Sequence, residues 1–492
     1  MALGFRHIRI RLPKRLSEGY GISENFIDEV ANGVIVTVDN GIKAMGAVRK
    51  AKKKGLVVMI MDHHQPEIKN GSIQLPEADL IVDPHIPREK IQKEDYPENF
   101  MEYTEYCAAG LVFKLAEILL RNGPVFDKIA SMAAIATIAD VVDLTGDNRN
   151  LYRYGIQCIA AGHMTAGLGA LVRHIQPGCI ISEDDIGFKI GPILNAPGRL
   201  YDKGATEAFS LLVTENYDAA QLQLQSLLLA NEKRKEEKKQ AYKRAKEQIA
   251  SLHMEQDNPV IIVDPETSEG IVGLVAGDIC EEYGVTTIVL TEKNGNYKGS
   301  ARACEGDSII DLLNAVYESH PEYFISYGGH PGAAGLSVRY EHIDAFKKEI
   351  SSKIGPRHGK TQYLEYDLEI RVEDIPRLIE ELKKYAPYGQ GNKRPVFLIR
   401  EFRLAPKDNL FFKFLGEDSI RVHGNGCTAV GFGIRDKFIG DYPSVIDIVG
   451  TLTENRFMKR TENQIEILDI KIPEKENTCS LMDSIAKALQ NL

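Results

Sequence analysis

The sequence lacks several features that mark common classes of protein. Its seven cysteines are scattered and form no C-x-x-C pair, so neither a zinc knuckle nor a disulfide framework is indicated. No stretch approaches the roughly 18 consecutive apolar residues of a membrane helix, and residues 1–6 lack the apolar core of a signal peptide. No internal repeat or low-complexity tract is present. We therefore expect a cytoplasmic protein with no membrane partner.

An excess of basic residues is also missing. The formal net charge is -10, from 60 Lys and Arg against 70 Asp and Glu. This argues against a uniformly basic surface for nucleic acid but allows a local basic groove. The 492 residues suffice for about three domains of ordinary size. The hydrophobic fraction of 43% and the charged fraction of 26% are typical of globular proteins.

Two apolar runs near the N-terminus each end in residues that can bind a metal. Residues 33–38 lead into Asp39, and residues 56–60 lead into Asp62-His63-His64. The helical pattern between them makes a strand, helix, strand unit of a parallel sheet, whose strands we expect to be buried on both faces. Neighbouring parallel strands lie about 5 Å apart, so Asp39 and His63 can reach one divalent ion. The simpler alternative is a capping aspartate followed by two solvated histidines.

A third potential ligand ends a predicted helix. Residues 128–139 are apolar nearly all round, which predicts a core helix ending at Asp140. A carboxylate at the end of a buried helix is costly unless it meets a cation. The alternative is an ordinary turn or capping aspartate. We expect Asp39, His63 and Asp140 to share one divalent cation.

Five short strings in a fixed order carry more information than any one of them. They are VTVDNG at 36–41, Asp62-His63-His64, ATIADVV at 136–142, GPILNAPGRL at 191–200 and GGH at 328–330. In this order they resemble motifs of the DHH phosphoesterase superfamily and, within it, of the RecJ family of single-strand-specific 5′ exonucleases. The resemblance runs from about residue 11 to 397, and more loosely to 473.

The resemblance implies an α/β fold with several domains. These are a parallel-sheet DHH domain (1–217), a long connecting helix (218–252), a smaller α/β DHHA1 domain (253–356), an oligonucleotide-binding (OB-like) β-barrel domain (360–473) and a C-terminal tail (474–492). The connecting helix is also indicated by a long helical pattern without Gly or Pro. Five phenylalanines of the last domain are candidates for base stacking, with a core position as the alternative: Phe397, Phe402, Phe411, Phe412 and Phe414.

The resemblance also implies Mn²⁺ or Mg²⁺ as cofactor and a role for each motif residue. Asp39 matches a ligand shared by two ions, while His63 and Asp140 match ligands of one of them. His64 matches the histidine that contacts the scissile phosphate, and Asp62 resembles an acid that orients a histidine. Glycines at 195–199, 298–303 and 328–335 predict turns and loops that approach phosphate closely. The implied DNA-binding residues are Arg15, Arg199, Ser300, Arg302, Gly329 and His330.

The chain departs from the family pattern at its N-terminus. RecJ-like proteins carry a first strand ending in Asp-x-Asp-Gly ahead of the segment that matches residues 11–21, and residues 1–11 offer no replacement. Three explanations are open: a start codon further upstream or a fragmentary gene, a split enzyme completed by another chain, or a metal-poor relative that binds DNA without cutting it. We therefore expect the activity of this chain alone to be in doubt.

The expected function is metal-dependent hydrolysis of single-stranded DNA from the 5′ end, in repair or recombination. Single-stranded DNA is the expected partner, with a helicase or a single-strand-binding protein as a further one. One alternative is a DHH phosphodiesterase acting on short oligonucleotides or cyclic dinucleotides. The roughly 120 residues beyond the Gly-Gly-His segment favour a polymeric substrate instead. The other alternative is a nucleic-acid-binding protein without catalysis.

Overall fold

The chain forms two compact units, Met1–Lys360 and Thr361–Leu492. The computed structural model describes residues 4–14, 17–19, 21–69, 71–86, 103–254, 257–355, 364–405, 412–415, 419–438, 443–457 and 460–472. Within these ranges no helix combines the length and the apolar character needed to cross a membrane.

The first unit begins with a small parallel sheet in the order β1-β2-β5. Its strands are β1 (Val34–Val38), β2 (Val57–Met61) and β5 (Leu80–Val82), flanked by α1 (Glu24–Asp28) and α2 (Met45–Lys53). A hairpin of β3 (Glu67–Lys69) and β4 (Ser72–Gln74) follows β2. The strand, helix, strand order matches the predicted unit.

The described residues of this sheet are well buried on one face only, so the prediction of strands buried on both faces was wrong for them. Ile35, Val58 and Ile60 pack with alanines and Val48 of α2. Side chains alternate between faces along a strand, and the opposite face leaves Val34 59%, Val36 53% and Val38 42% exposed. The other aliphatic residues exposed on the three strands are Val57, Leu80 and Val82. The described residues cover this face only near Met61, which packs against Tyr106 and Leu111.

A bundle of helices completes the first part of the unit. Its core is a single cluster of apolar side chains centred on α4, α5 and α6. The Asn195–Arg199 segment lies inside a helix, so the predicted turn was wrong: Ile193, Ala196 and Pro197 are buried at helical spacing, and this packing outweighs the turn signal of Pro and Gly. The elements are α3 (Ala108–Leu120), α4 (Pro124–Ala139), α5 (Gly146–Ala160), α6 (Ala166–Ile175), α7 (Glu183–Asp185), the π-helix η3 (Ile186–Ile190), α8 (Gly191–Leu200) and α9 (Gly204–Val213).

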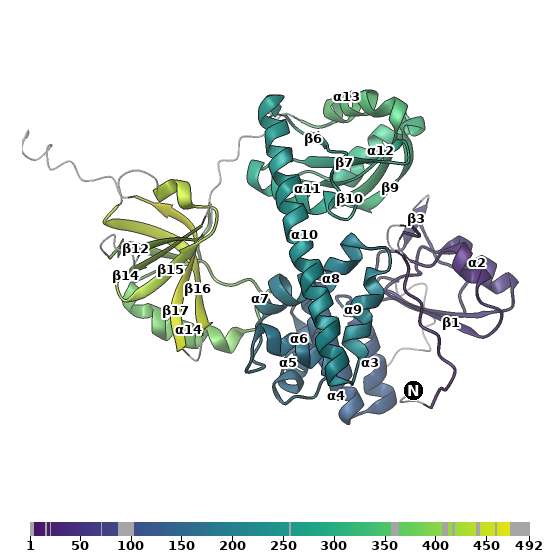
Figure 1. Ribbon diagram of the computed structural model, residues 1–492, viewed down its shortest axis with the longest axis horizontal. Helices are drawn as coiled ribbons and strands as arrows, with labels where there is room; N and C mark the ends of the chain where they lie inside the picture. Colours follow the sequence, from purple (N-terminus) through teal and green to yellow (C-terminus); the bar gives the residue numbers. More distant parts are fainter. Residues whose placement is uncertain are drawn as a thin grey trace, which may run out of the picture. The chain divides into compact units, whose positions relative to one another are not determined.

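The long helix α10 (Tyr217–Ser251, 35 residues) links this bundle to a second sheet (Figure 1). Its first half buries Ala220, Leu224 and Leu227 in the bundle core. Its second half buries Ala241, Ala245 and Ile249 in the core of the following lobe. One continuous helix therefore contributes to both hydrophobic cores.

The second lobe is built on five strands in the order β6-β7-β8-β10-β9. β6 pairs in parallel with β7, and the other neighbours are antiparallel. The segments 298–303 and 328–335, predicted as loops, lie largely in strands β8, β9 and β10, so that prediction was wrong. The elements are β6 (Val260–Val263), α11 (Val272–Tyr283), β7 (Thr287–Lys293), β8 (Asn296–Arg302), α12 (Ile309–Ser319), η5 (Pro321–Tyr323), β9 (Phe324–His330), β10 (Ala333–Arg339), η6 (Tyr340–His342) and α13 (Ile343–Lys353).

The second unit is a seven-stranded curled sheet in the order β11-β12-β16-β17-β15-β14-β13. A single bridge from Leu404 to Gly424 joins the end of β12 to β14, but no described ladder joins the outer strands β11 and β13, so the barrel is not closed. Phe397 and Phe402 are core residues, whereas Phe414 is partly exposed. Phe411 and the side chain of Phe412 lie outside the described residues. The elements are β11 (Leu368–Ile370), η7 (Val372–Asp374), α14 (Ile375–Leu382), η8 (Lys383–Tyr385), β12 (Phe397–Arg403), β13 (Phe412–Leu415), β14 (Ser419–Gly424), β15 (Cys427–Gly431), η9 (Arg435–Phe438), β16 (Val445–Phe457) and β17 (Arg460–Lys471).

Candidate metal centre

The carboxyl ends of β1 and β2 bring Asp39 and His63 together. The Asp39 amide donates to the carbonyl oxygen of Met61 at 3.0 Å, which extends the pairing of the two strands by one residue. Asp39 then takes a left-handed backbone conformation (φ 65°), unusual for a residue other than glycine. This turn ends the strand and leaves the Asp39 carboxylate 62% exposed beside His63.

His63 lies between two carboxylates. Its Nε2 atom is 3.1 Å from Asp39 Oδ1 and 3.3 Å from Asp140 Oδ2. The hydrogen bond to Asp39 raises the pKa of His63 against the opposing effect of burial, and the charge of Asp140 adds to the increase. Asp140 is the residue at which α4 ends, and partial burial raises the pKa of its carboxyl group. Asp39 and Asp140 therefore each approach His63, while the three side chains at this centre whose potential ligand atoms all lie within 4.8 Å of one another are Asp39, His63 and His64.

The two distances from His63 Nε2 are compatible with neighbouring ligands of one divalent cation. Two ligands at adjacent corners of an octahedron with bonds of about 2.1 Å lie about 3 Å apart, close to both distances measured from His63 Nε2. One imidazole and two carboxylates are donors that suit Mn²⁺ or Mg²⁺. Asp140 is 43% exposed and Asp39 more so, so water and a substrate oxygen could complete the coordination.

Asp62 holds His64 rather than the metal-facing His63. The Asp62 carboxylate is almost fully buried and accepts hydrogen bonds from the backbone amides of Ile42 (3.0 Å), His63 (2.8 Å) and His64 (3.3 Å). Its Oδ1 atom also lies 2.7 Å from His64 Nδ1. Burial alone would raise the pKa of Asp62, but these hydrogen bonds lower it, and the same contact raises the pKa of His64. His64 is thereby oriented with its other ring nitrogen unused by Asp62.

A third strand end contributes residues that the sequence patterns did not reveal. Asp83 follows β5, and its Oδ1 atom accepts the His85 amide at 2.9 Å. Its buried Oδ2 atom has no hydrogen-bond partner among the described residues. Burial raises the pKa of Asp83 to about 6, and the negative charge of Asp62 adds to this. The sequence does contain a sign of this strand end: the short apolar run at residues 80–82 is followed by Asp83 and His85, as the runs of β1 and β2 are followed by metal-ligating residues.

Ser300 and Arg302 form a second polar group on β8, at the start of α11. Arg302 donates to Ser300 Oγ at 2.8 Å and to the Ala301 carbonyl oxygen at 2.9 Å. A Cβ atom placed on Gly273 would lie 3.1 Å from Ser300 Oγ and 3.2 Å from an Arg302 nitrogen. A hydroxyl, a guanidinium and the N-terminal turn of a helix therefore lie together, a combination that favours an anion such as phosphate.

The remaining predicted DNA contacts differ in their surroundings. Arg199 donates to the Gly270 carbonyl oxygen at 3.3 Å, which joins the end of α8 to the loop before α11. His330 is exposed at the end of β9. A Cβ on Gly329 would lie 2.2 Å from the Ala333 carbonyl oxygen, so strand packing accounts for this glycine. Arg15 lies outside the described residues.

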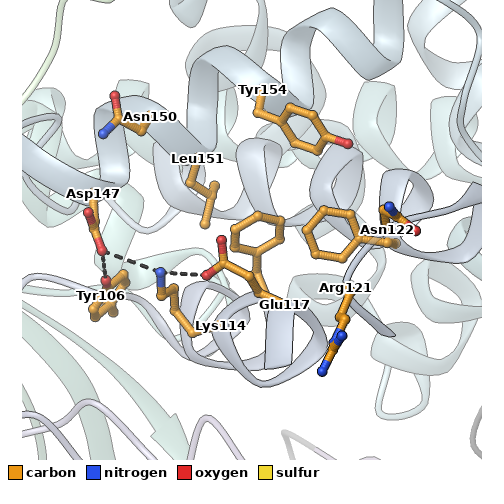
Figure 2. Close-up of a pocket in the computed structure, with 11 residues that line it drawn as sticks. Tyr106, Lys114, Glu117, Arg121, Asn122, Asp147, Asn150, Leu151 and Tyr154 are labelled. Carbon is orange, nitrogen blue, oxygen red and sulfur yellow. Dashed lines mark hydrogen bonds and ion pairs between the residues drawn. The ribbon is translucent and has the colours of Figure 1, made fainter. Parts of the chain in front are cut away.

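A cavity in the helical bundle lies apart from this centre. It has a volume of about 450 Å³ and lies between α3, α4 and α5 (Figure 2). Lys114 spans it with ion pairs to Glu117 at 2.6 Å and to Asp147 at 3.5 Å. Its cation is thus already neutralised within the cavity wall. The potential metal ligands around His63, rather than this cavity, identify the candidate site.

Sequence models of three families match the chain. They are the DHH family N-terminal domain over residues 6–139, the DHHA1 domain over residues 257–355 and the RecJ OB domain over residues 366–469. The chain thus contains a DHH domain, a DHHA1 domain and a RecJ OB domain.

Two relatives, both named single-stranded-DNA-specific exonuclease RecJ, match most of the chain. The protein from Bacillus subtilis (strain 168) is 30% identical over 479 residues, which are 94% of this chain and 57% of the relative. The protein from Haemophilus influenzae is 30% identical over 420 residues, 80% of this chain and 70% of the relative. The chain belongs to the RecJ family. It spans little more than half the length of the Bacillus subtilis relative.

A solved structure shows the same fold. The crystal structure of RecJ from Thermus thermophilus in complex with Mn²⁺ superposes with a TM-score of 0.71 and 24% identity, covering 92% of this chain and 63% of that one.

Proposed function

We propose that this chain hydrolyses single-stranded DNA from its 5′ end with the help of a divalent cation, Mn²⁺ or Mg²⁺. The observation that carries the proposal is the placement of His63 Nε2 between Asp39 and Asp140, at 3.1 and 3.3 Å, in a chain of the RecJ family. Asp39, His63 and Asp140 would hold the cation. The Mn²⁺ bound in the Thermus thermophilus protein supports this choice of cofactor.

The cation would make hydroxide available near neutral pH and stabilise the charge that develops on the phosphate. The chain's own residues supply orientation. Asp62 fixes the His64 ring through Nδ1, and Nε2 of this half-exposed side chain would donate a hydrogen bond to an oxygen of the scissile phosphate. The carboxylate of Asp62 favours the protonated form of His64 that makes this donation, since their contact raises the histidine pKa.

The second lobe would hold the nucleic acid. Arg302 and Ser300 would bind the terminal phosphate, because they lie together at the N-terminal turn of α11. Arg199, Gly329, His330 and Arg15 would contact the neighbouring backbone. We assign residues 1–217, 218–252, 253–356 and 360–473 to the DHH domain, the connecting helix, the DHHA1 domain and the OB-like domain, and residues 474–492 to a tail. A helicase or single-strand-binding protein would be a natural partner of such an enzyme.

A polymeric substrate is favoured over dinucleotides by the RecJ OB domain match over residues 366–469. The strength of the activity depends on the second metal position. Among the described residues that meet at His63, Asp39 is the carboxylate placed to bridge this centre to another ion. We therefore propose that this chain alone is a weak nuclease.

The test is cleavage of labelled single strands with Mn²⁺. We expect nucleotides to be released from the 5′ end of a linear strand, with no cutting of a circular strand or a duplex. Asp39→Ala should lower the cleavage rate by about 100-fold or more, because it removes a metal ligand. The control is Asp344→Ala, which replaces an exposed aspartate on α13 and should leave the rate unchanged. Cleavage that survives Asp39→Ala would contradict the metal assignment. Hydrolysis of dinucleotides alone, or binding without cleavage, would support the two alternatives.

A further inference from the structure

A second group of metal-ligating side chains lies on the helical bundle, apart from the strand ends. Asp127 is in the first turn of α4, Cys158 is near the end of α5, and His163 is in the turn that follows α5. One ligand atom from each lies within 4.8 Å of the others. Because α4 and the end of α5 are about 30 residues apart in the chain, their convergence is a result of folding and not of sequence proximity.

Hydrogen bonds fix the positions of all three residues. The His163 amide donates to the Cys158 carbonyl oxygen at 2.8 Å. The buried hydroxyl of Ser131 lies 2.8 Å from the His163 carbonyl oxygen and 3.0 Å from that of Asp127, which ties the turn to α4. The Tyr154 hydroxyl donates to Asp127 Oδ1 at 2.7 Å. Asp127 Oδ2 is left facing His163 Nδ1 at 2.9 Å.

The Tyr154 hydroxyl thus already bonds Oδ1 of Asp127 and orients the carboxylate. This is the arrangement found around bound metals, where a partner outside the coordination sphere holds a ligand in place. Tyr154 also forms one wall of the cavity between α3, α4 and α5, opposite Tyr106 and Asp147 (Figure 2). Its hydroxyl group thus links that wall to the Asp127 group.

The donor set has a chemical preference different from that of the strand-end centre. A thiolate sulfur, an imidazole nitrogen and a carboxylate oxygen suit Zn²⁺, whereas Mg²⁺ and Mn²⁺ prefer oxygen-rich sites. Ligands of a tetrahedral zinc ion are about 3.5 Å apart, so small side-chain rotations would bring atoms now within 4.8 Å to bonding positions. Cys158 is 5% exposed, while the His163 side chain is 56% exposed. An ion could enter from the His163 side, with water as its fourth ligand.

We propose that Asp127, Cys158 and His163 form a zinc site that fastens the start of α4 to the turn after α5. Binding would replace the contact between Asp127 Oδ2 and His163 Nδ1, whose proton would pass to Nε2 of a neutral ring or, from an imidazolium, to solvent. The thiol proton of Cys158 would also be released to solvent as the sulfur becomes a thiolate. Because α4 carries Asp140 at its other end, a zinc ion here would brace the helix that delivers a ligand to the strand-end centre.

The test uses the full chain, stripped of metal with a chelator and then titrated with Co²⁺. A thiolate bound to Co²⁺ absorbs in the near ultraviolet through charge transfer, and the strand-end ligands contain no sulfur, so they cannot produce this band. We expect the band in the wild type, its loss in Cys158→Ser and in His163→Gln, and its displacement by Zn²⁺. Cys179→Ser, which changes another partly buried cysteine of the same core, should retain it.

The thermal unfolding midpoint is the second measurement. Because the strand-end ligands can bind Zn²⁺ in every variant, Zn²⁺ should raise it more in the wild type and in Cys179→Ser than in His163→Gln, whose exposed side chain can change without disturbing the core. The proposal would be overturned if the wild type gives no charge-transfer band, if the band persists in Cys158→Ser, or if Zn²⁺ shifts all variants equally. Any of these results would mean that Asp127 and His163 contact each other without binding a metal. None of them depends on nuclease activity.

Discussion

Asp83 shows how a single buried carboxylate can limit stability. Burial raises its pKa to about 6 from an ordinary 3.8. A raised carboxyl pKa means that the folded state holds the proton more tightly than the unfolded chain does. The contribution of Asp83 to stability is therefore fully present below pH 3.8 and is lost as the pH rises through about 6.

Replacing Asp83 by asparagine should remove this pH-dependent cost. The asparagine side chain would be neutral at every pH and could still accept the His85 amide. We expect Asp83→Asn to raise the free energy of unfolding of the metal-free protein at pH 8 by about 1–3 kcal/mol, with little change near pH 4. Denaturant unfolding at the two pH values measures this difference. An equal change at both would show that the effect is not electrostatic.

The contact between Asp62 and His64 allows a test of whether the Asp62 carboxylate holds the His64 ring in place. Their contact raises the His64 pKa, so this pair stabilises the folded protein fully below the ordinary histidine pKa of 6.5, and the stabilisation is lost as the pH rises through the raised value. In Asp62→Asn the His64 pKa should fall, because the carboxylate charge is gone. Histidine proton resonances of the metal-free protein, followed against pH, report this pKa. An unchanged His64 titration would rule out the proposed role of Asp62.

The same substitution should also lower stability. Asp62 accepts three backbone amides in a buried position, and a neutral amide replaces a charged acceptor, so we expect a loss of about 1–3 kcal/mol. Asp28→Asn is a control, because its carboxylate is exposed at 61% and pairs with Lys50 on the surface.

At the scale of elements, the contact between α8 and the loop before α11 leaves no space for a side chain. A Cβ on Gly270 would lie 1.9 Å from the Arg199 carbonyl oxygen, so Gly270→Ala must move backbone. We expect a loss of about 1–3 kcal/mol in the free energy of unfolding. Gly277→Ala, within α11 and with nothing within 4 Å of its Cβ, should instead add about 0.5–1 kcal/mol. Similar values for both variants would contradict this packing.

The elements also show how far sequence patterns reach. The apolar runs before Asp39 and Asp62 were long enough to identify β1 and β2, and their polar ends identified the candidate ligands. Leu80-Ile81-Val82 was too short to be recognised as a strand, so Asp83 was missed. Gly299 was taken as a sign of a phosphate loop. The structure places it in β8, where a Cβ would lie 2.2 Å from the Val289 carbonyl oxygen. Local composition alone cannot separate close strand packing from ligand binding.

At the scale of the whole molecule, the first sheet exposes an unusual surface. Parallel sheets normally bury both faces, yet Val34, Val36 and Val38 line an open face together with Val57, Leu80 and Val82. We expect this chain to bind a hydrophobic fluorescent dye in its folded state, and Val36→Thr to reduce the fluorescence. Val213→Thr, which changes an isolated exposed valine at the end of α9, should not. Equal signals from both variants would place the dye elsewhere.

The open face has a practical consequence for enzymology. Among the described residues, β1 is also an edge strand of its sheet. An exposed edge strand next to a hydrophobic surface promotes self-association. Molecules that stack through this surface would hide Asp39, at the end of β1, from the solvent. Specific activity should then decline in concentrated samples and recover on dilution, a reversible self-inhibition that a mild detergent would relieve.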